Sequence, residues 1–112
     1  MKIVIAADNA DIGSLVSPIF GRCSYFVFVD TDAMKFLAIE NPAKQASGGA
    51  GIKAAQFVID KGARAVIAGG VGPNAAKVLK QSDTPIFISQ GESVSQTAKM
   101  FVDGKLNRYH MD

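Results

Sequence analysis

The sequence predicts an α/β fold with a mixed five-stranded sheet and helices on both faces, in the order β-β-β-α-β-α-β-α. Two observations carry this prediction. Short apolar runs rich in β-branched and aromatic residues are typical of buried strands. In the later part of the chain, such runs alternate with segments whose apolar residues have helical spacing. This alternation over the last five elements implies parallel strands joined by right-handed crossovers.

The first part of the chain is expected to form three strands. Residues 3–7 are a continuous apolar run that ends at Asp8, which indicates a central strand lying beside the fourth strand. A loop follows, and residues 25–30 and 34–40 then have strand composition. Because only a short turn separates the latter two, we expect them to pair as an antiparallel hairpin.

Helices and strands alternate beyond the glycine-rich loop at residues 47–51. Gly62 has the position that commonly ends a helix, Pro73 suits a first helical turn, and Ser93 with Gln96 matches a capping box. The expected elements are a helix over 52–61, a strand over 65–68, a helix over 73–81, a strand over 85–89, and a helix from Ser93 to Gly104. We therefore expect a single domain over residues 1–105 and a polar, loosely held tail over 106–112.

Composition excludes several classes of function. The 112 residues suit one domain, and 12 basic against 10 acidic residues give a net charge of +2, too small to indicate a nucleic-acid partner. Cys23 is the single cysteine, which excludes an internal disulfide and fits a reducing compartment. The apolar run at the N-terminus is far shorter than the ~20 residues of a spanning helix. We expect a cytoplasmic protein without a membrane partner.

Glycine-rich loops are the strongest candidates for a binding site. Residues 49–51 and 70–72 both precede predicted helices, and the topology brings both to the edge where the parallel strands end. Three helix N-termini are expected to converge there, and free N–H groups at helix N-termini favour an anion or a polyanionic cofactor. The alternative is that these glycines only make tight turns.

The second glycine loop also matches a dinucleotide fingerprint. Residues 70–75 read G-x-G-x-x-A between a strand and a helix, the context in which that motif binds a pyrophosphate. Pro73 removes one backbone donor, and the next strand ends at Gln90 rather than at an acidic residue. A nucleotide or a phosphorylated metabolite is therefore the second candidate ligand.

Arg22 and Cys23 form the other candidate site. A neighbouring guanidinium lowers a thiol pKa, and a thiolate is a good ligand for soft metals and iron–sulfur clusters. The alternatives are that Cys23 is a small buried hydrophobe and that Arg22 binds an anion directly or makes a surface ion pair. His110 is the only histidine and lies in the tail, so no catalytic residue is assigned.

Four segments in order resemble the dinitrogenase iron–molybdenum cofactor biosynthesis family, of the NifX and NifB C-terminal type. The resemblance covers about residues 1–105. The segments are Ile3 to Asp8, Phe20-Gly21-Arg22-Cys23-x-Tyr25-Phe26, Gly48 to Gly51, and Ala68 to Ala75.

The resemblance implies a three-layer α/β/α fold of the ribonuclease-H-like type and a non-enzymatic protein that binds or carries an anionic iron–sulfur-type cluster or a precursor of the iron–molybdenum cofactor. It also implies a protein partner in cofactor assembly. Many members have His before the Phe-Gly-Arg triplet, where this chain has Ile19, which leaves Cys23 as the candidate metal ligand. The candidate binding residues are Arg22, Gly49, Gly51, Gly70, Gly72 and Asn74. The alternative function is an enzyme or sensor that binds a nucleotide or phosphometabolite at the same loops.

Overall fold

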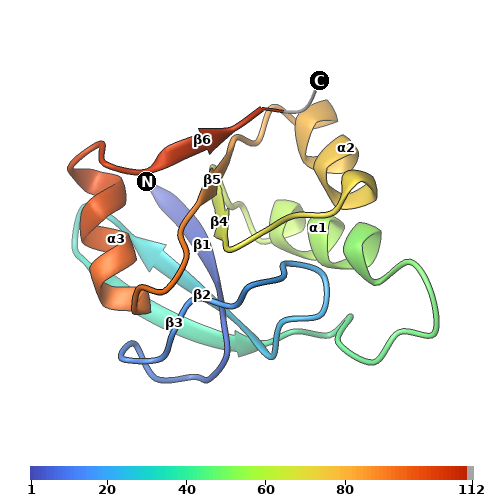
Figure 1. The fold of residues 1–112 in the computed structure, drawn as a ribbon, viewed down its shortest axis with the longest axis horizontal. Helices are drawn as coiled ribbons and strands as arrows, with labels where there is room; N and C mark the ends of the chain where they lie inside the picture. The colour runs from blue at the N-terminus through green and yellow to red at the C-terminus, as the bar shows by residue number, and fades with distance from the viewer. Residues whose placement is uncertain (111–112) are drawn as a thin grey trace.

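The computed structural model describes residues 1–110 and has six strands and three helices within them (Figure 1). In chain order they are β1 (Lys2–Ala7), β2 (Tyr25–Asp30), β3 (Lys35–Glu40), α1 (Ala50–Asp60), β4 (Val66–Ala68), α2 (Pro73–Gln81), β5 (Ile86–Ile88), α3 (Val94–Val102) and β6 (Asn107–Tyr109). Every helix and strand expected from the sequence is present. Gly62 and Gly104 follow α1 and α3 with φ of +86° and +70°, the left-handed conformation that favours glycine after a helix.

The sheet order is β3-β2-β1-β4-β5-β6. β2 and β3 form the expected antiparallel hairpin, and β1 lies parallel to β4, as predicted. The prediction of five strands is wrong, because β6 pairs antiparallel with β5 through Tyr109 opposite Ile86 and Asn107 opposite Ile88. Residues 107–109 thus belong to the sheet rather than to a loosely held tail.

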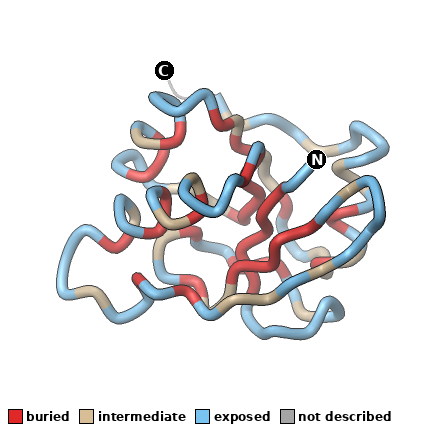
Figure 2. The backbone as a smooth tube through the Cα atoms, turned by 180° about the vertical axis from the view of Figure 1, so that it is seen from behind, coloured by how far each residue is buried: buried red, intermediate tan, exposed pale blue. Residues whose placement is uncertain are grey.

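Helices cover both faces of the sheet and make three layers. α1 and α2 pack on one face, where Val58 and Leu79 join Val4 and Phe26 in one buried cluster. α3 packs on the other face through residues such as Val94. Figure 1 shows α1 and α2 on one side of the strands and α3 on the other, and Figure 2 shows the buried residues concentrated along the strands between them. The ribonuclease-H-like label stays a prediction.

The long connection between β1 and β2 is held against the carboxyl edge of the sheet. Ser17 N donates to Ala6 O at 2.8 Å, and Gly69 N donates to Ser17 O at 2.9 Å. Phe20 N donates to Gly70 O at 3.1 Å, and the Phe20 side chain is buried. These contacts fix the loop that carries Arg22 beside the glycine loop that follows β4. No helix in the described part of the chain combines the length and the apolar character needed to cross a membrane.

Candidate anion-binding site

A pocket of about 310 Å³ lies where the starts of α1 and α2 meet the loop between β1 and β2. It brings together five of the candidate residues predicted from the sequence. The pocket is lined by Ile19, Gly21, Arg22, Gly49, Ala50, Gly51, Ile52, Gly72, Pro73, Asn74 and Ala75. The remaining two candidates, Gly70 and Cys23, do not line it.

The first turn of α1 has free backbone donors. Gly49 is the N-cap residue, with φ of +68°, and no side chain caps the helix. The first helical hydrogen bond runs from Lys53 N to Gly49 O, so the amides of Ala50, Gly51 and Ile52 have no acceptor among residues 1–110. Such amides carry the partial positive charge of a helix N-terminus.

The first turn of α2 is similar. Gly72 is its N-cap residue and again no side chain caps the helix. Ala76 N donates to Gly72 O, and Pro73 has no N–H, so the amides of Asn74 and Ala75 are the free donors of this turn within the described chain. The two helices together offer five backbone donors to one pocket.

The start of α3 does not take part, although three converging N-termini were expected. Gln96 N donates to the Ser93 hydroxyl at 3.1 Å, which confirms the predicted cap. Val94 N and Ser95 N donate at 2.9 Å to the carbonyls of Ser14 and Ile12 in the loop after β1. The donors of this helix are therefore already paired.

Close backbone contacts explain why glycine occupies two positions around the pocket. A Cβ added at Gly21 would lie 2.9 Å from Gly51 Cα, a distance that real Cβ atoms do not reach without a shift of the backbone. Gly51 in turn faces Ala75 of α2. The absence of side chains at these two glycines lets the loop, α1 and α2 meet.

Arg22 lies at the mouth of the pocket and is exposed. Its Nη1 donates to Lys44 O at 3.1 Å, which ties the loop after β1 to the loop before α1. A guanidinium has five N–H donors, so this contact leaves donors for a ligand. Arg22 makes no ion pair with a carboxylate of residues 1–110. It supplies the one formal positive charge among the lining residues.

Cys23 lies inside the core rather than in the pocket. Its side chain is 2% exposed, and its thiol donates to Tyr25 O at 3.3 Å. Burial raises the pKa of the Cys23 thiol to about 12. The expected lowering of the thiol pKa by Arg22 is therefore wrong, and the placement fits the alternative that Cys23 is a small buried hydrophobe.

Gly70 serves packing instead of lining the pocket. A Cβ there would lie 3.1 Å from Pro18 O, and Gly70 O accepts the Phe20 amide. Sequence reasoning did not single out Asn41, which is buried and organises the Arg22 loop. Its Nδ2 donates at 3.0 Å to both Gly21 O and Cys23 O, and its Oδ1 accepts from Ala43 N at 2.9 Å. An Asn directly before Pro42 is so common in turns that it gave no signal of this role.

The arrangement can hold an anion but offers no metal ligands of its own. The lining residues include no Cys, His, Asp or Glu. In the described chain no three such residues are grouped in a way that would hold a metal ion. The donors are backbone amides and one guanidinium, which recognise negative charge. A metal would have to arrive in the pocket with its own ligands.

Fold and site together define a small three-layer α/β domain with a pocket lined by backbone donors at the carboxyl edge of its sheet. Residues 1–104 match the family described as "Dinitrogenase iron-molybdenum cofactor". The chain belongs to this family.

Two solved structures and one further relative support the assignment. The apo form of the orange protein from Desulfovibrio gigas is 33% identical and superposes with a TM-score of 0.91, covering 96% of this chain and 92% of that one. The structure of a candidate NifB protein from Thermotoga is 29% identical, with a TM-score of 0.84, and the match covers 99% of this chain and 97% of that one. An uncharacterized protein of Methanocaldococcus jannaschii is 31% identical, over 97% of this chain and 92% of its own length.

Proposed function

We propose that this protein is a non-enzymatic carrier that binds an anionic iron–sulfur-type cluster, or a precursor of the iron–molybdenum cofactor, in the pocket between α1 and α2. The observation that carries the proposal is the pair of uncapped helix starts that share one pocket with Arg22. Each start contributes roughly half a positive charge, which is stabilised by a bound anion. The same proposal places the protein in the cytoplasm, where it has neither a membrane partner nor a nucleic-acid partner.

The cargo would be held through its own sulfide or thiolate atoms. The pocket supplies hydrogen-bond donors and lacks side chains that coordinate metals, so it suits a cluster assembled elsewhere. Cluster sulfurs accept hydrogen bonds from proteins, and these bonds help to set the reduction potential of the cluster. Binding that leaves the metal ligands unchanged also allows release to a partner protein in cofactor assembly, which suits a carrier.

The comparisons support this class of cargo. The family description names the iron–molybdenum cofactor, and the orange protein structure is described as an apo form, which implies that this relative takes a ligand. Ile19 lines the pocket at the position where many family members have His. An isoleucine there adds an apolar wall, which fits cargo held by its periphery better than cargo coordinated by the protein.

A nucleotide or phosphorylated metabolite is the second candidate, for an enzyme or sensor. The observation that favours it is that the amides of Asn74 and Ala75 start a helix directly after the strand–glycine loop, as in phosphate-binding turns. Pro73 weighs against it, because a dinucleotide fingerprint uses more backbone donors than this turn has.

The deciding experiment is anaerobic incubation with iron, sulfide and a small thiol, followed by gel filtration, absorbance and metal analysis. We expect a coloured protein with a fixed metal content per chain. Arg22→Gln should lower cluster retention about 10-fold, since a charge-assisted hydrogen bond contributes roughly 1.5–3 kcal/mol. Arg64→Gln, an exposed arginine outside the pocket, is the matched control.

Two further arms separate the alternatives. Cys23→Ala should retain the cluster, and loss of the chromophore in this variant would show that Cys23 is a ligand after all. If the protein stays colourless and is instead stabilised saturably by ATP in thermal unfolding, the nucleotide alternative replaces the carrier.

A further inference from the structure

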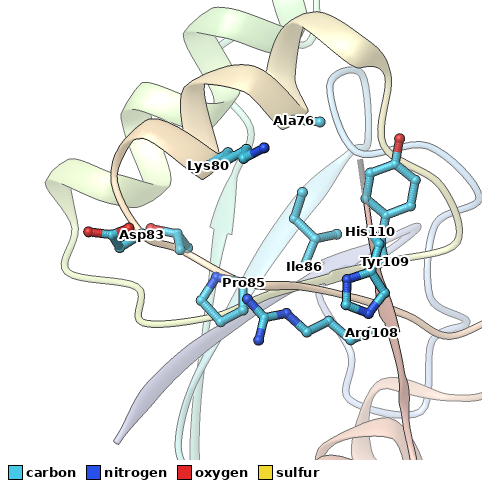
Figure 3. A pocket seen from close by; sticks show the side chains of 9 residues that line it. Ala76, Lys80, Asp83, Pro85, Ile86, Arg108, Tyr109 and His110 are labelled. Carbon is cyan, nitrogen blue, oxygen red and sulfur yellow. The ribbon is translucent and has the colours of Figure 1, made fainter. Parts of the chain in front are cut away.

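A second hollow, of about 370 Å³, lies at the opposite edge of the sheet (Figure 3). It is bounded by the end of α2, the loop before β5 and the sixth strand, β6. The lining side chains that carry polar chemistry are Lys80, Asp83, Thr84, Arg108, Tyr109 and His110. The hollow exists because β6 extends the sheet beneath the last turn of α2.

Positive groups reach this hollow from two separate elements. Lys80 extends into it from α2, and Arg108 approaches from β6 on the other side (Figure 3). The imidazole of His110 adds a third nitrogen-bearing group at the same end of β6. Within residues 1–110 the one ion pair joins the N-terminal ammonium to Asp32, so Lys80 and Arg108 are not neutralised by a carboxylate there.

Asp83 is the one carboxylate among the lining residues. In Figure 3 its side chain is directed away from the Lys80 ammonium, and no ion pair joins the two. Lys80 also lies in the last turn of α2, where it offsets part of the negative charge of the helix C-terminus. The electrostatic character of the hollow is therefore set by Lys80 and Arg108.

An apolar wall accompanies the charges. Ala76, Pro85 and Ile86 also line the hollow. Its volume lies within the roughly 300–1,000 Å³ of small-molecule sites, and a bare inorganic anion would leave the apolar wall uncovered. The combination fits a molecule with one strongly charged end and an apolar body.

We propose that this hollow binds a small organic phosphate. The phosphate lies between the Arg108 guanidinium and the Lys80 ammonium, and the apolar body packs on Pro85 and Ile86. Arginine presents a planar set of donors that matches phosphate oxygens, and lysine adds a point charge. The site is separate from the glycine pocket, because the two share no lining residue. The proposal does not rest on the carrier function.

The test is a titration of the ¹⁵N-labelled full chain with phenyl phosphate, followed by amide shifts in NMR spectra. Phenol and inorganic phosphate are the matched probes for the two halves of the ligand. We expect saturable shifts of the Thr84 and Ile86 amides and of the amides of residues 108–110 with phenyl phosphate, and weaker binding of either half. Arg108→Gln and Lys80→Gln should each weaken binding about 10-fold, as the loss of a charge-assisted hydrogen bond predicts. Lys99→Gln, on α3 at the other face, should change nothing.

Three outcomes would overturn the proposal. Amide shifts confined to residues 49–51, 72, 74 and 75 would place the phosphate in the glycine pocket. Equal affinity for phenol and phenyl phosphate would show that the hollow does not recognise the charge of the phosphate. Absence of saturable shifts, or wild-type affinity in both Arg108→Gln and Lys80→Gln, would show that the two cations do not form a site.

Discussion

Gly51 in α1 lies against Ala75 in α2, so closely that a Cβ at Gly51 would be 3.3 Å from the Ala75 Cβ. Both residues belong to the first turn of their helix, and both amides are free of acceptors in the described chain. The contact therefore places two helix N-termini side by side at one pocket. One helix N-terminus alone attracts an anion weakly. Because the two N-termini lie side by side, their attractions for an anion in the pocket add together.

Gly21→Ala should destabilise the protein by about 1–3 kcal/mol, because the new methyl group would overlap the backbone of Gly51 and force the two segments apart. The same displacement should widen the pocket and weaken ligand binding. Urea unfolding measures the first effect, and cluster retention measures the second.

The control for this substitution is Gly48→Ala. Nothing lies within 4 Å of a Cβ at Gly48, and the residue is exposed. Its unfolding midpoint should match or slightly exceed that of the wild type. A Gly21→Ala variant with unchanged stability and binding would mean that the loop and α1 are not in the contact described.

The strands and helices were predictable because their signals are local. An apolar run such as residues 3–7 is stable only when it is buried, which indicates a central strand. The alternation of helices and strands later in the chain limits the possible topologies to a few. β6 was missed because it is a short edge strand whose residues Asn107 and Arg108 are exposed. A triplet in which Tyr109 alone is partly buried is too short to show the alternation of a strand, and its place is decided by the neighbouring β5.

The glycine site was predictable in outline and not in detail. Glycines before helices predicted a pocket at this edge, and Gly49, Gly51 and Gly72 line one, while anion binding there stays a prediction. Gly70 has the same local sequence character, yet its role depends on contact with Pro18, which is distant in the chain. The burial of Cys23 likewise depends on tertiary packing, so its high pKa could not be inferred from its neighbour Arg22.

Asn41→Ala should cost about 2–4 kcal/mol of folding free energy. The change removes four hydrogen bonds of a side chain that is 3% exposed and leaves the carbonyls of Gly21 and Cys23 without this donor. Asn74→Ala, at an exposed position, should cost far less. Urea unfolding of both variants decides the matter: equal midpoints would show that the Asn41 network does not stabilise the loop.

The Cys23 thiol should be inert near neutral pH and should make the fold sensitive to alkali. Its pKa is about 12 in the folded chain against 9.0 for an unperturbed thiol, so the folded state retains the proton in the range between these values. The stabilisation is complete below pH 9.0 and is lost as pH rises toward 12, by up to about 1.4 kcal/mol per pH unit.

Two measurements check this behaviour. Iodoacetamide should alkylate Cys23 slowly in the native protein and rapidly in urea, because only the thiolate reacts and the native thiol is buried. The decrease in unfolding free energy between about pH 9 and about pH 11 should be smaller in Cys23→Ala than in the wild type. Fast native alkylation would contradict the burial of the thiol.

Gly72→Asp should stabilise the fold and weaken the proposed binding at the same time. Gly72 has an extended backbone, with φ of −67° and ψ of 162°, and nothing lies within 4 Å of a Cβ there, so an aspartate fits without strain. Its carboxylate would accept from the free amides of Asn74 or Ala75, as the Ser93 hydroxyl does for α3. A helix cap and the loss of a flexible glycine together should add about 0.5–1 kcal/mol to the free energy of unfolding.

The same carboxylate occupies the donors and repels an anion, so cluster retention should decrease by at least about 10-fold. Gly72→Ser is the matched variant, since it caps without charge and should reduce retention less. Wild-type retention in Gly72→Asp would show that these amides do not bind the cargo, and the open start of α2 would then need another explanation.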